Sequence, residues 1–327
     1  MASVLERHAP ATSTDPSPRR HGVALALAAA GVSGIAVFVN GEAVGRFPSP
    51  TTYTTAKNLV AGSLLVAIAV WAATHRLHHT GERPTPDRTV AWLAVVAVIG
   101  GAIPFVLFFE GLARASSTDA AFLHKTLVIW AAILATVVLR ERLTGWHVAA
   151  IALLVGGHAA LTGGLGSLRL GVGEVMILVA TLCWAVELVL VKRLVRSVPT
   201  PVVAAVRLGG GSVVLVAWLG ATARLDELAG LSAAQWGWVA VTGSILAAFV
   251  SLWFAALARA PVIDVAAILV VGAVVTGVLG IVVGRDPLGG RLPGWVLIAV
   301  GAALVAGHAW TASRPREEVV PEGRIES

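Results

Sequence analysis

The chain has 327 residues, of which 57% are hydrophobic and only 13% are charged. A water-soluble protein has roughly 25% charged residues, so this composition excludes an ordinary soluble domain and indicates a protein that folds in a lipid bilayer. The net charge of +6 does not indicate nucleic-acid binding, because the basic residues form short clusters between apolar runs and no single basic face.

The apolar runs predict an all-α membrane protein with ten transmembrane helices. About 20 predominantly apolar residues cross the hydrocarbon core, and helices are required because lipid offers no partner to unpaired backbone groups. In chain order the predicted spans are 21–39, 52–73, 90–112, 118–138, 144–162, 173–191, 201–221, 234–257, 262–283 and 292–311. We expect residues 1–20 to form a disordered N-terminal tail and residues 312–327 a charged C-terminal tail.

The distribution of Lys and Arg predicts the orientation. These residues are more frequent in the loops and tails that lie on the same side as the N-terminus, and cytoplasmic loops carry the excess of positive charge. An even number of spans leaves both ends on one side. We therefore expect a multi-pass protein of the inner or plasma membrane with both termini in the cytoplasm.

Two stretches of the chain repeat at a constant spacing. The matching pairs are Phe109/Phe254, Leu112/Leu257, Ala113/Ala258, Arg114/Arg259, Ala115/Ala260 and Asp119/Asp264. Each copy holds five spans, an odd number, so the second copy is inverted in the membrane. The sequence thus predicts two inverted five-helix repeats, residues 21–162 and 173–311. Inverted repeats are typical of secondary transporters, which bind substrate between the halves.

Short motifs carry a resemblance to a known family. The run Leu139-Arg140-Glu141-Arg142-Leu143-Thr144-Gly145-Trp146 ends the fourth span, and Arg285-Asp286-Pro287-Leu288 ends the ninth. With a basic residue early in the second and seventh spans, Lys57 and Arg207, these motifs resemble the EamA family of the drug/metabolite transporter superfamily. The resemblance covers residues 21–311 and implies export or exchange of small metabolites through a central cavity, by alternating access.

Ionisable residues inside spans are the first candidates for the transport path, because a charge in the membrane needs a partner or a wet cavity. Lys125 lies well inside the fourth span, next to His124. Glu110 lies near the end of the antiparallel third span and could pair with Lys125, which leaves two roles for that lysine: lining the path, or a structural ion pair or snorkelling to the surface.

Three more ionisable residues have two interpretations each. Lys57 and Arg207 could attract anionic or carboxylate-bearing substrates at the two mouths of a cavity, or they could anchor helices at the lipid headgroups, which is the ordinary role of such residues. Glu187 could couple transport to protons, although a local interaction with the basic cluster at Lys192 is the simpler interpretation.

Two tryptophans lie deeper than the others. Trp130 and Trp184 could form an aromatic wall for a ligand, or they could pack against lipid or core. We expect the cavity to be lined by the first, third, fourth, sixth, eighth and ninth spans.

Local backbone signals complete the sequence predictions. Asp119 and Asp264 begin the fourth and ninth spans, where aspartate typically caps a helix. A carboxylate at Glu141 opposes the dipole at the end of its own helix and so needs a specific partner. Gly100, Gly101 and Pro104 predict a kink in the third span.

The sequence leaves two rival functions open. A membrane-embedded enzyme could use His124 or His158 as an acid/base, and a receptor or scaffold would bind without transport, but inverted repeats favour transport over both. No hydrolytic or nucleotide motif is present, and His75, His78 and His79 lack a thiol or carboxylate at metal-ligand spacing. We expect no catalytic residue, metal or cofactor. The expected partners are a small-molecule substrate and the lipid bilayer. We expect transport to be driven by an ion or substrate gradient, and the sequence leaves the oligomeric state open.

Overall fold

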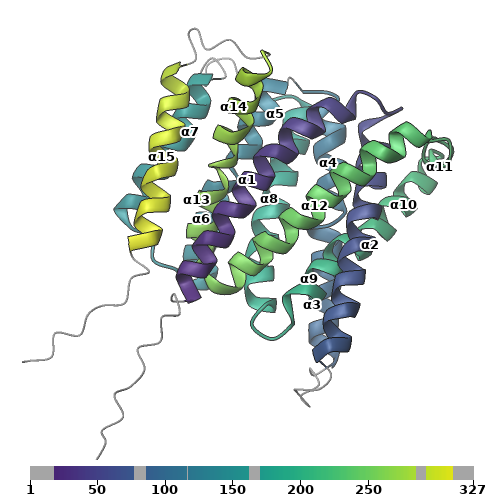
Figure 1. Cartoon of the computed structure of the whole chain (residues 1–327), viewed down its shortest axis with the longest axis horizontal. Coiled ribbons are helices and arrows are strands. Elements are labelled where there is room, and N and C mark those ends of the chain that lie inside the picture. Colours follow the sequence, from purple (N-terminus) through teal and green to yellow (C-terminus); the bar gives the residue numbers. More distant parts are fainter. Residues whose placement is uncertain (1–17, 77–85, 116, 162–169, 285–291, 312–327) are drawn as a thin grey trace, which may run out of the picture.

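The structure is a computed structural model that describes residues 18–76, 86–115, 117–161, 170–284 and 292–311. In these ranges the chain is all-helical (Figure 1). The second copy of the motif at residues 285–288, as well as His78 and His79, lies outside the described residues.

Each predicted span coincides with one helix or with consecutive helices. In chain order these are α1 Pro18–Val44, α2 Pro50–Arg76, α3 Pro86–Ile99, α4 Ile103–Leu112, α5 Ser117–Lys125, α6 Leu127–Leu139, α7 Gly145–Leu161, α8 Val172–Leu194, α9 Thr200–Ala205, the π-helix η2 Val206–Gly210, α10 Gly211–Ala221, α11 Leu225–Ala229, α12 Ala233–Arg259, α13 Val262–Leu269, α14 Gly272–Val282 and α15 Leu292–Thr311.

Seven of these segments are long and apolar enough to cross a membrane. They are Pro18–Val44, Pro50–His75, Arg88–Leu112, Val172–Leu194, Thr200–Ala221, Ala233–Arg259 and Val262–Val282. Three further apolar helices, Leu123–Leu139, Gly145–Leu161 and Leu292–Val305, are shorter. The chain is therefore a multi-pass membrane protein.

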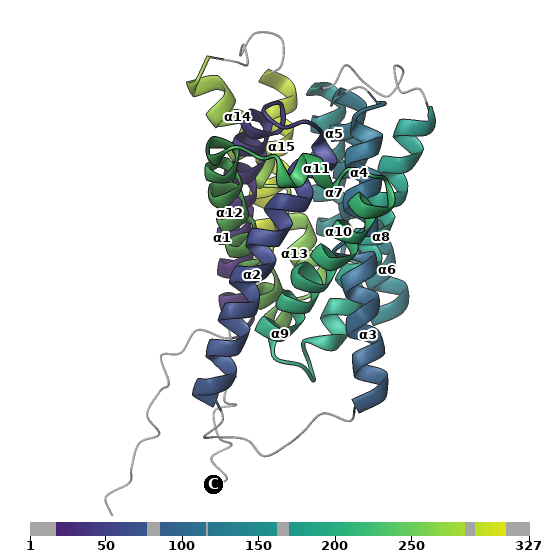
Figure 2. The same ribbon diagram turned by 90° about the vertical axis from the view of Figure 1, so that its right-hand side faces the viewer.

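The bundle has two ends, between which successive segments run in alternating directions. In Figure 1, α1 begins and α15 finishes at the lower end, whereas α11 lies at the upper end. The view in Figure 2 agrees on the position of α11. We call the lower end the Asp264 end and the upper end the Glu227 end, after residues described below.

The first and second halves of the chain interleave. Helix α1 packs against α12, α13 and α14, while α8 packs against α3, α4, α5 and α6. Helices α7 and α15 pack against each other at one edge of the bundle (Figure 1). Residues from both halves therefore meet in the middle of the molecule.

The predicted kink in the third span is present as a break between α3 and α4. A Cβ atom added to Gly101 would lie 1.8 Å from the carbonyl oxygen of Arg207, so only glycine allows this approach of α3 to η2. A Cβ on Gly100 would lie 2.3 Å from the carboxyl carbon of Glu187. The break thus brings Gly100 against the side chain of Glu187 and Gly101 against the backbone of Arg207.

Candidate functional site: a cavity at the centre of the bundle

An internal cavity of about 220 Å³ lies between the two halves of the chain. Its lining comes from α1, α4, α5, α6, α8, α12 and α13, which belong to the six spans expected to line it. Lys57 of α2 and Arg207 of η2 add the second and seventh spans. Five predicted site residues line the cavity: Lys57, His124, Lys125, Trp184 and Arg207.

Lys57 is buried and has no carboxylate partner. Its side chain is only 4% exposed, and no ion pair of the described residues includes it. The ammonium nitrogen lies over the rings of Tyr53 and Phe109, 5.0 and 5.5 Å from their centroids. Headgroup anchoring is therefore wrong for Lys57, because its ammonium group faces the interior and aromatic faces.

Arg207 is also buried, but it is neutralised by Glu187. The Arg207 Nη2 atom donates to Glu187 Oε2 at 3.0 Å, and its Nε atom donates to Oε1. The two side chains are 4% and 0% exposed. This two-pronged geometry is the strong form of a charge-assisted hydrogen bond. This bidentate pair rules out headgroup anchoring for Arg207, because both charged groups are buried inside the bundle.

The expected interaction of Glu187 with Lys192 is wrong. Lys192 lies further along α8 and donates to the carbonyl oxygens of Leu257 and Ala260, at 2.6 and 2.7 Å. Helix rotation explains the difference, because Glu187 points towards Arg207 of η2 whereas Lys192 reaches the end of α12. Lys192 therefore ties two helix ends together and leaves Glu187 to Arg207.

His124 and Lys125, the last two residues of α5, both line the cavity. The expected pair between Glu110 and Lys125 is wrong. Glu110 accepts hydrogen bonds from Thr51 and Arg114, both at 2.8 Å, at the Glu227 end. No ion pair of the described residues includes Lys125.

Aromatic rings form two walls of the cavity. In one group Trp184 contacts Phe105 and His124, with ring centroids 5.5 and 5.1 Å apart. In the other group Phe249 and Trp253 of α12 stack at 5.4 Å with an interplanar angle of 19°. These edge and offset contacts are favourable geometries for aromatic pairs.

Of the two tryptophans predicted to form a wall, only Trp184 lines the cavity. Trp130 lies one turn into α6 and its indole N–H donates to Thr126 Oγ1 at 3.2 Å. Its ring is thereby held beside the break between α5 and α6. The rotation of α6 about its own axis, which hydropathy does not specify, decides this difference.

The lining residues that sequence reasoning missed include Asn40, Thr242, Phe249 and Trp253. Asn40 accepts a hydrogen bond from the hydroxyl of Tyr53, and Trp253 is 4% exposed with an indole N–H that has no hydrogen-bond partner among the described residues. A polar residue inside an apolar span was the available signal for Thr242, whereas Asn40 follows the predicted first span, which the structure extends to Val44. Nothing in the local sequence distinguishes Phe249 and Trp253 from lipid-facing aromatic residues.

A polar network closes the Glu227 end. Glu227 of α11 accepts hydrogen bonds from Arg224 at 2.9 Å and from Ser49 at 2.8 Å, as well as from Thr52. Arg224 also reaches Glu110 of α4 at 3.4 Å. Hydrogen bonding by Arg224, followed by that of Thr52, lowers the pKa of Glu227 to about 2. We call this set, with Thr51 and Arg114, the Glu227 network.

A second polar network lies at the Asp264 end. Asp264 accepts hydrogen bonds from His147 Nε2 and Arg19 Nη2, both at 2.9 Å. Glu141 accepts from the backbone N–H groups of Val262 at 2.9 Å and of Ile263 at 3.1 Å. These four polar side chains, Arg19, Glu141, His147 and Asp264, form the Asp264 network.

The expectation that Asp264 caps its own helix is wrong. Glu141, at the end of the fourth span, supplies the cap of α13 instead, since its carboxylate meets the free N–H groups and the positive end of that helix. This contact also explains why a carboxylate is tolerated at the end of α6. Asp264 is thus left to join α13 to α1 and α7.

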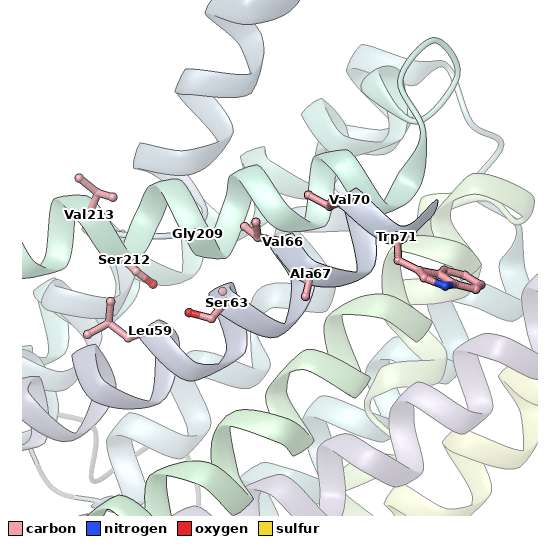
Figure 3. Close-up of a pocket in the computed structure, with 10 residues that line it drawn as sticks. Leu59, Ser63, Val66, Ala67, Val70, Trp71, Gly209, Ser212 and Val213 are labelled. Atoms are coloured by element: carbon pink, nitrogen blue, oxygen red, sulfur yellow. The ribbon is translucent and has the colours of Figure 1, made fainter. Parts of the chain in front are cut away.

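A larger groove of about 690 Å³ lies outside the central cavity. Helix α2 approaches η2 closely where Gly62 lies against Gly209, and both glycines line this groove. Figure 3 shows Val70, Trp71 and Val213 along this groove, and all three are exposed. Its apolar, exposed lining is typical of a surface that contacts lipid.

The chain is similar in sequence to one family over most of its length. The sequence pattern described as the EamA-like transporter family matches residues 20–163 and again residues 171–307. No curated protein matches the chain in sequence. One solved crystal structure is similar over 87% of this chain and 97% of its own, with a TM-score of 0.69 and 20% identity, which indicates a shared fold.

Proposed function

Since the chain belongs to the EamA-like transporter family, we propose that it is a secondary transporter that exports or exchanges a small molecule by alternating access. The resemblance inferred from the motifs around Glu141 is confirmed by this membership. The substrate would pass through the central cavity, and the two polar networks would control access to it from either end.

The proposed architecture is ten spans in two inverted repeats, residues 21–162 and 173–311. Two separate matches to one family pattern support the duplication. The alternating direction of the segments, with the described chain beginning and finishing at the same end (Figure 1), supports the inversion. By the positive-inside rule the Asp264 end faces the cytoplasm, and the membrane is the plasma membrane.

The observation that carries the proposal is the charged cavity between the halves. Insertion of one charged residue at the centre of a membrane helix costs about 2.5–3.5 kcal/mol. Lys57, Lys125 and Arg207 nevertheless meet at one cavity, and only Arg207 has an ion-pair partner among the described residues. Structural packing does not require such a cluster, whereas a binding site for a polar solute does.

The two networks are suited to act as gates. The Glu227 network joins the start of α2, the end of α4 and α11. The Asp264 network joins the start of α1, the start of α7 and the start of α13. In alternating access each network opens in turn while the other stays closed, and the broken helices α3–α4 and α5–α6 provide points at which the bundle can bend.

Counterflow in proteoliposomes tests the function. Vesicles that contain the purified protein are loaded with an unlabelled solute and exposed to the same solute carrying a label. A transporter accumulates label transiently in loaded vesicles and not in empty ones, whereas a receptor or an enzyme does not. If a broad set of amino acids, organic acids, nucleobases, sugars and organic cations shows binding but no counterflow, the proposed function is wrong.

A further inference from the structure

The cavity has an excess of positive charge. Lys57, Lys125 and Arg207 contribute three cationic side chains, and the one carboxylate beside them, Glu187, is already engaged by Arg207. The described lining contains neither Asp nor Glu. Two ammonium groups are therefore left without a counter-charge in the middle of a bundle that lipid surrounds.

Hydrogen-bond donors also outnumber acceptors in this cavity. An ammonium group has only donors, and the indole N–H of Trp253 adds another that is buried and without a partner among the described residues. The side-chain oxygen of Asn40 already accepts from Tyr53, and the hydroxyl oxygens of Ser33 and Thr242 are neutral acceptors. A ligand that satisfies these donors must bring acceptors and negative charge.

The rest of the lining is apolar and aromatic. Phe105 packs against Trp184, and Phe249 stacks on Trp253, and all four rings line the cavity. The volume of about 220 Å³ compares with about 150 Å³ for an engineered cavity that binds benzene. A molecule with one ring and a short charged substituent therefore fits, whereas an inorganic anion would leave the aromatic walls without contact.

We propose that the cavity selects a small organic anion, a carboxylate joined to an apolar or aromatic body about one ring in size. Lys57 and Lys125 bind the carboxylate, and the aromatic walls hold the body. The inference rests on the transport function proposed above and names the substrate class of that same site.

Three probes that share one ring but differ in charge test the selectivity: phenylacetate, benzylamine and benzyl alcohol. Acetate and inorganic phosphate report on charge without a ring. The readout is the unfolding midpoint of the purified protein in detergent, because a ligand that binds the folded state raises it. We expect phenylacetate to raise the midpoint in a saturable way, and the amine, the alcohol and the two small anions to have much weaker effects.

Charge-removing variants locate the effect in the cavity. Lys57→Met and Lys125→Met should each weaken phenylacetate binding about tenfold or more, equivalent to about 1.4 kcal/mol. Arg259→Met is the matched control, since it removes one positive charge from an exposed side chain whose guanidinium donates to Ala255 O at 2.8 Å outside the cavity. Its affinity for phenylacetate should equal that of the parent protein.

Two results overturn the inference: benzylamine or benzyl alcohol binds as well as phenylacetate, or both Lys→Met variants bind phenylacetate like the parent. Counterflow separates this failure from failure of the function. Counterflow of cations or neutral solutes without anions keeps the transporter and rejects the anion site. Selective phenylacetate binding with no counterflow of any solute keeps the anion site and rejects transport.

Discussion

The buried pair between Glu187 and Arg207 allows a quantitative prediction. Replacing Glu187 with Gln keeps the shape of the side chain but leaves the guanidinium without a counter-charge in a site where the two side chains are 0% and 4% exposed. Breaking a buried ion pair from one side costs about 3–5 kcal/mol. Because an arginine cannot lose its charge by releasing a proton, we expect Glu187→Gln to lie in this range.

Replacing the other partner, Arg207, should lower the free energy of unfolding by less. In Arg207→Met the carboxyl group left behind can become neutral by binding a proton. The double variant Glu187→Gln/Arg207→Met leaves no buried charge at this site. It should therefore be more stable than the sum of the single effects predicts, with a coupling of at least about 2 kcal/mol, within the range seen for residues in contact.

Lys57 provides the contrasting case within the same cavity. Since it has no carboxylate partner among the described residues, Lys57→Met leaves no opposite charge unpaired. The substitution removes cation–π contacts worth about 0.5–2 kcal/mol, while it also removes a buried charge whose desolvation costs several kcal/mol. We expect Lys57→Met to be neutral or stabilising.

Reversible unfolding in mixed detergent micelles with increasing SDS measures all four variants against the parent protein. The reasoning is refuted if the effects of Glu187→Gln and Arg207→Met add within about 0.5 kcal/mol. It is also refuted if Lys57→Met destabilises the protein as much as Glu187→Gln does.

Three further predictions concern the backbone and the two ends. Gly101→Ala should sharply reduce the yield of folded protein, because its Cβ would lie 1.8 Å from the Arg207 carbonyl oxygen, whereas Gly31→Ala, with open space around it, should not; size-exclusion chromatography separates the two outcomes. Glu141→Ala should lower the free energy of unfolding by about 0.5–2 kcal/mol, the effect of losing a helix cap, and an unchanged value contradicts the capping role. The pKa of Glu227 is lowered to about 2 from 4.5, so its network stabilises the folded state fully above pH 4.5 and loses this contribution as the pH falls towards 2. The unfolding midpoint of Glu227→Gln should therefore depend less on pH across this window than that of the parent protein. Equal pH dependence of the two midpoints counts against the assignment.

The apolar segments and the family could be predicted from the sequence, because both depend on residues close together in the chain. Hydropathy locates every helix of the described residues except the short α11, and the short motif around Glu141 led to the family that the comparison confirms. The break at Gly100 and Gly101 was also visible, since two glycines before a proline weaken the helix locally.

The partners of the charged side chains could not be predicted in this way. Glu187 bonds to a residue 20 positions away, and Glu141 caps a helix whose first N–H group lies 121 positions away. Such contacts depend on how far each helix is rotated about its axis and which helices cross it, neither of which average hydropathy encodes. Pairing Glu110 with Lys125, assigning the cap of α13 to Asp264 and placing Trp130 in the cavity wall was wrong for this reason.

The sequence by itself therefore determined that the chain lies in a membrane as apolar helices. It also showed that the ionisable residues inside these helices need a partner or a hydrated cavity. Only the tertiary structure decided that Lys57 and Lys125 share a cavity without a counter-charge while Arg207 is neutralised by Glu187. The physical reason is that burial of a segment follows from its own side chains, whereas the charge balance of a site follows from the packing of many segments together.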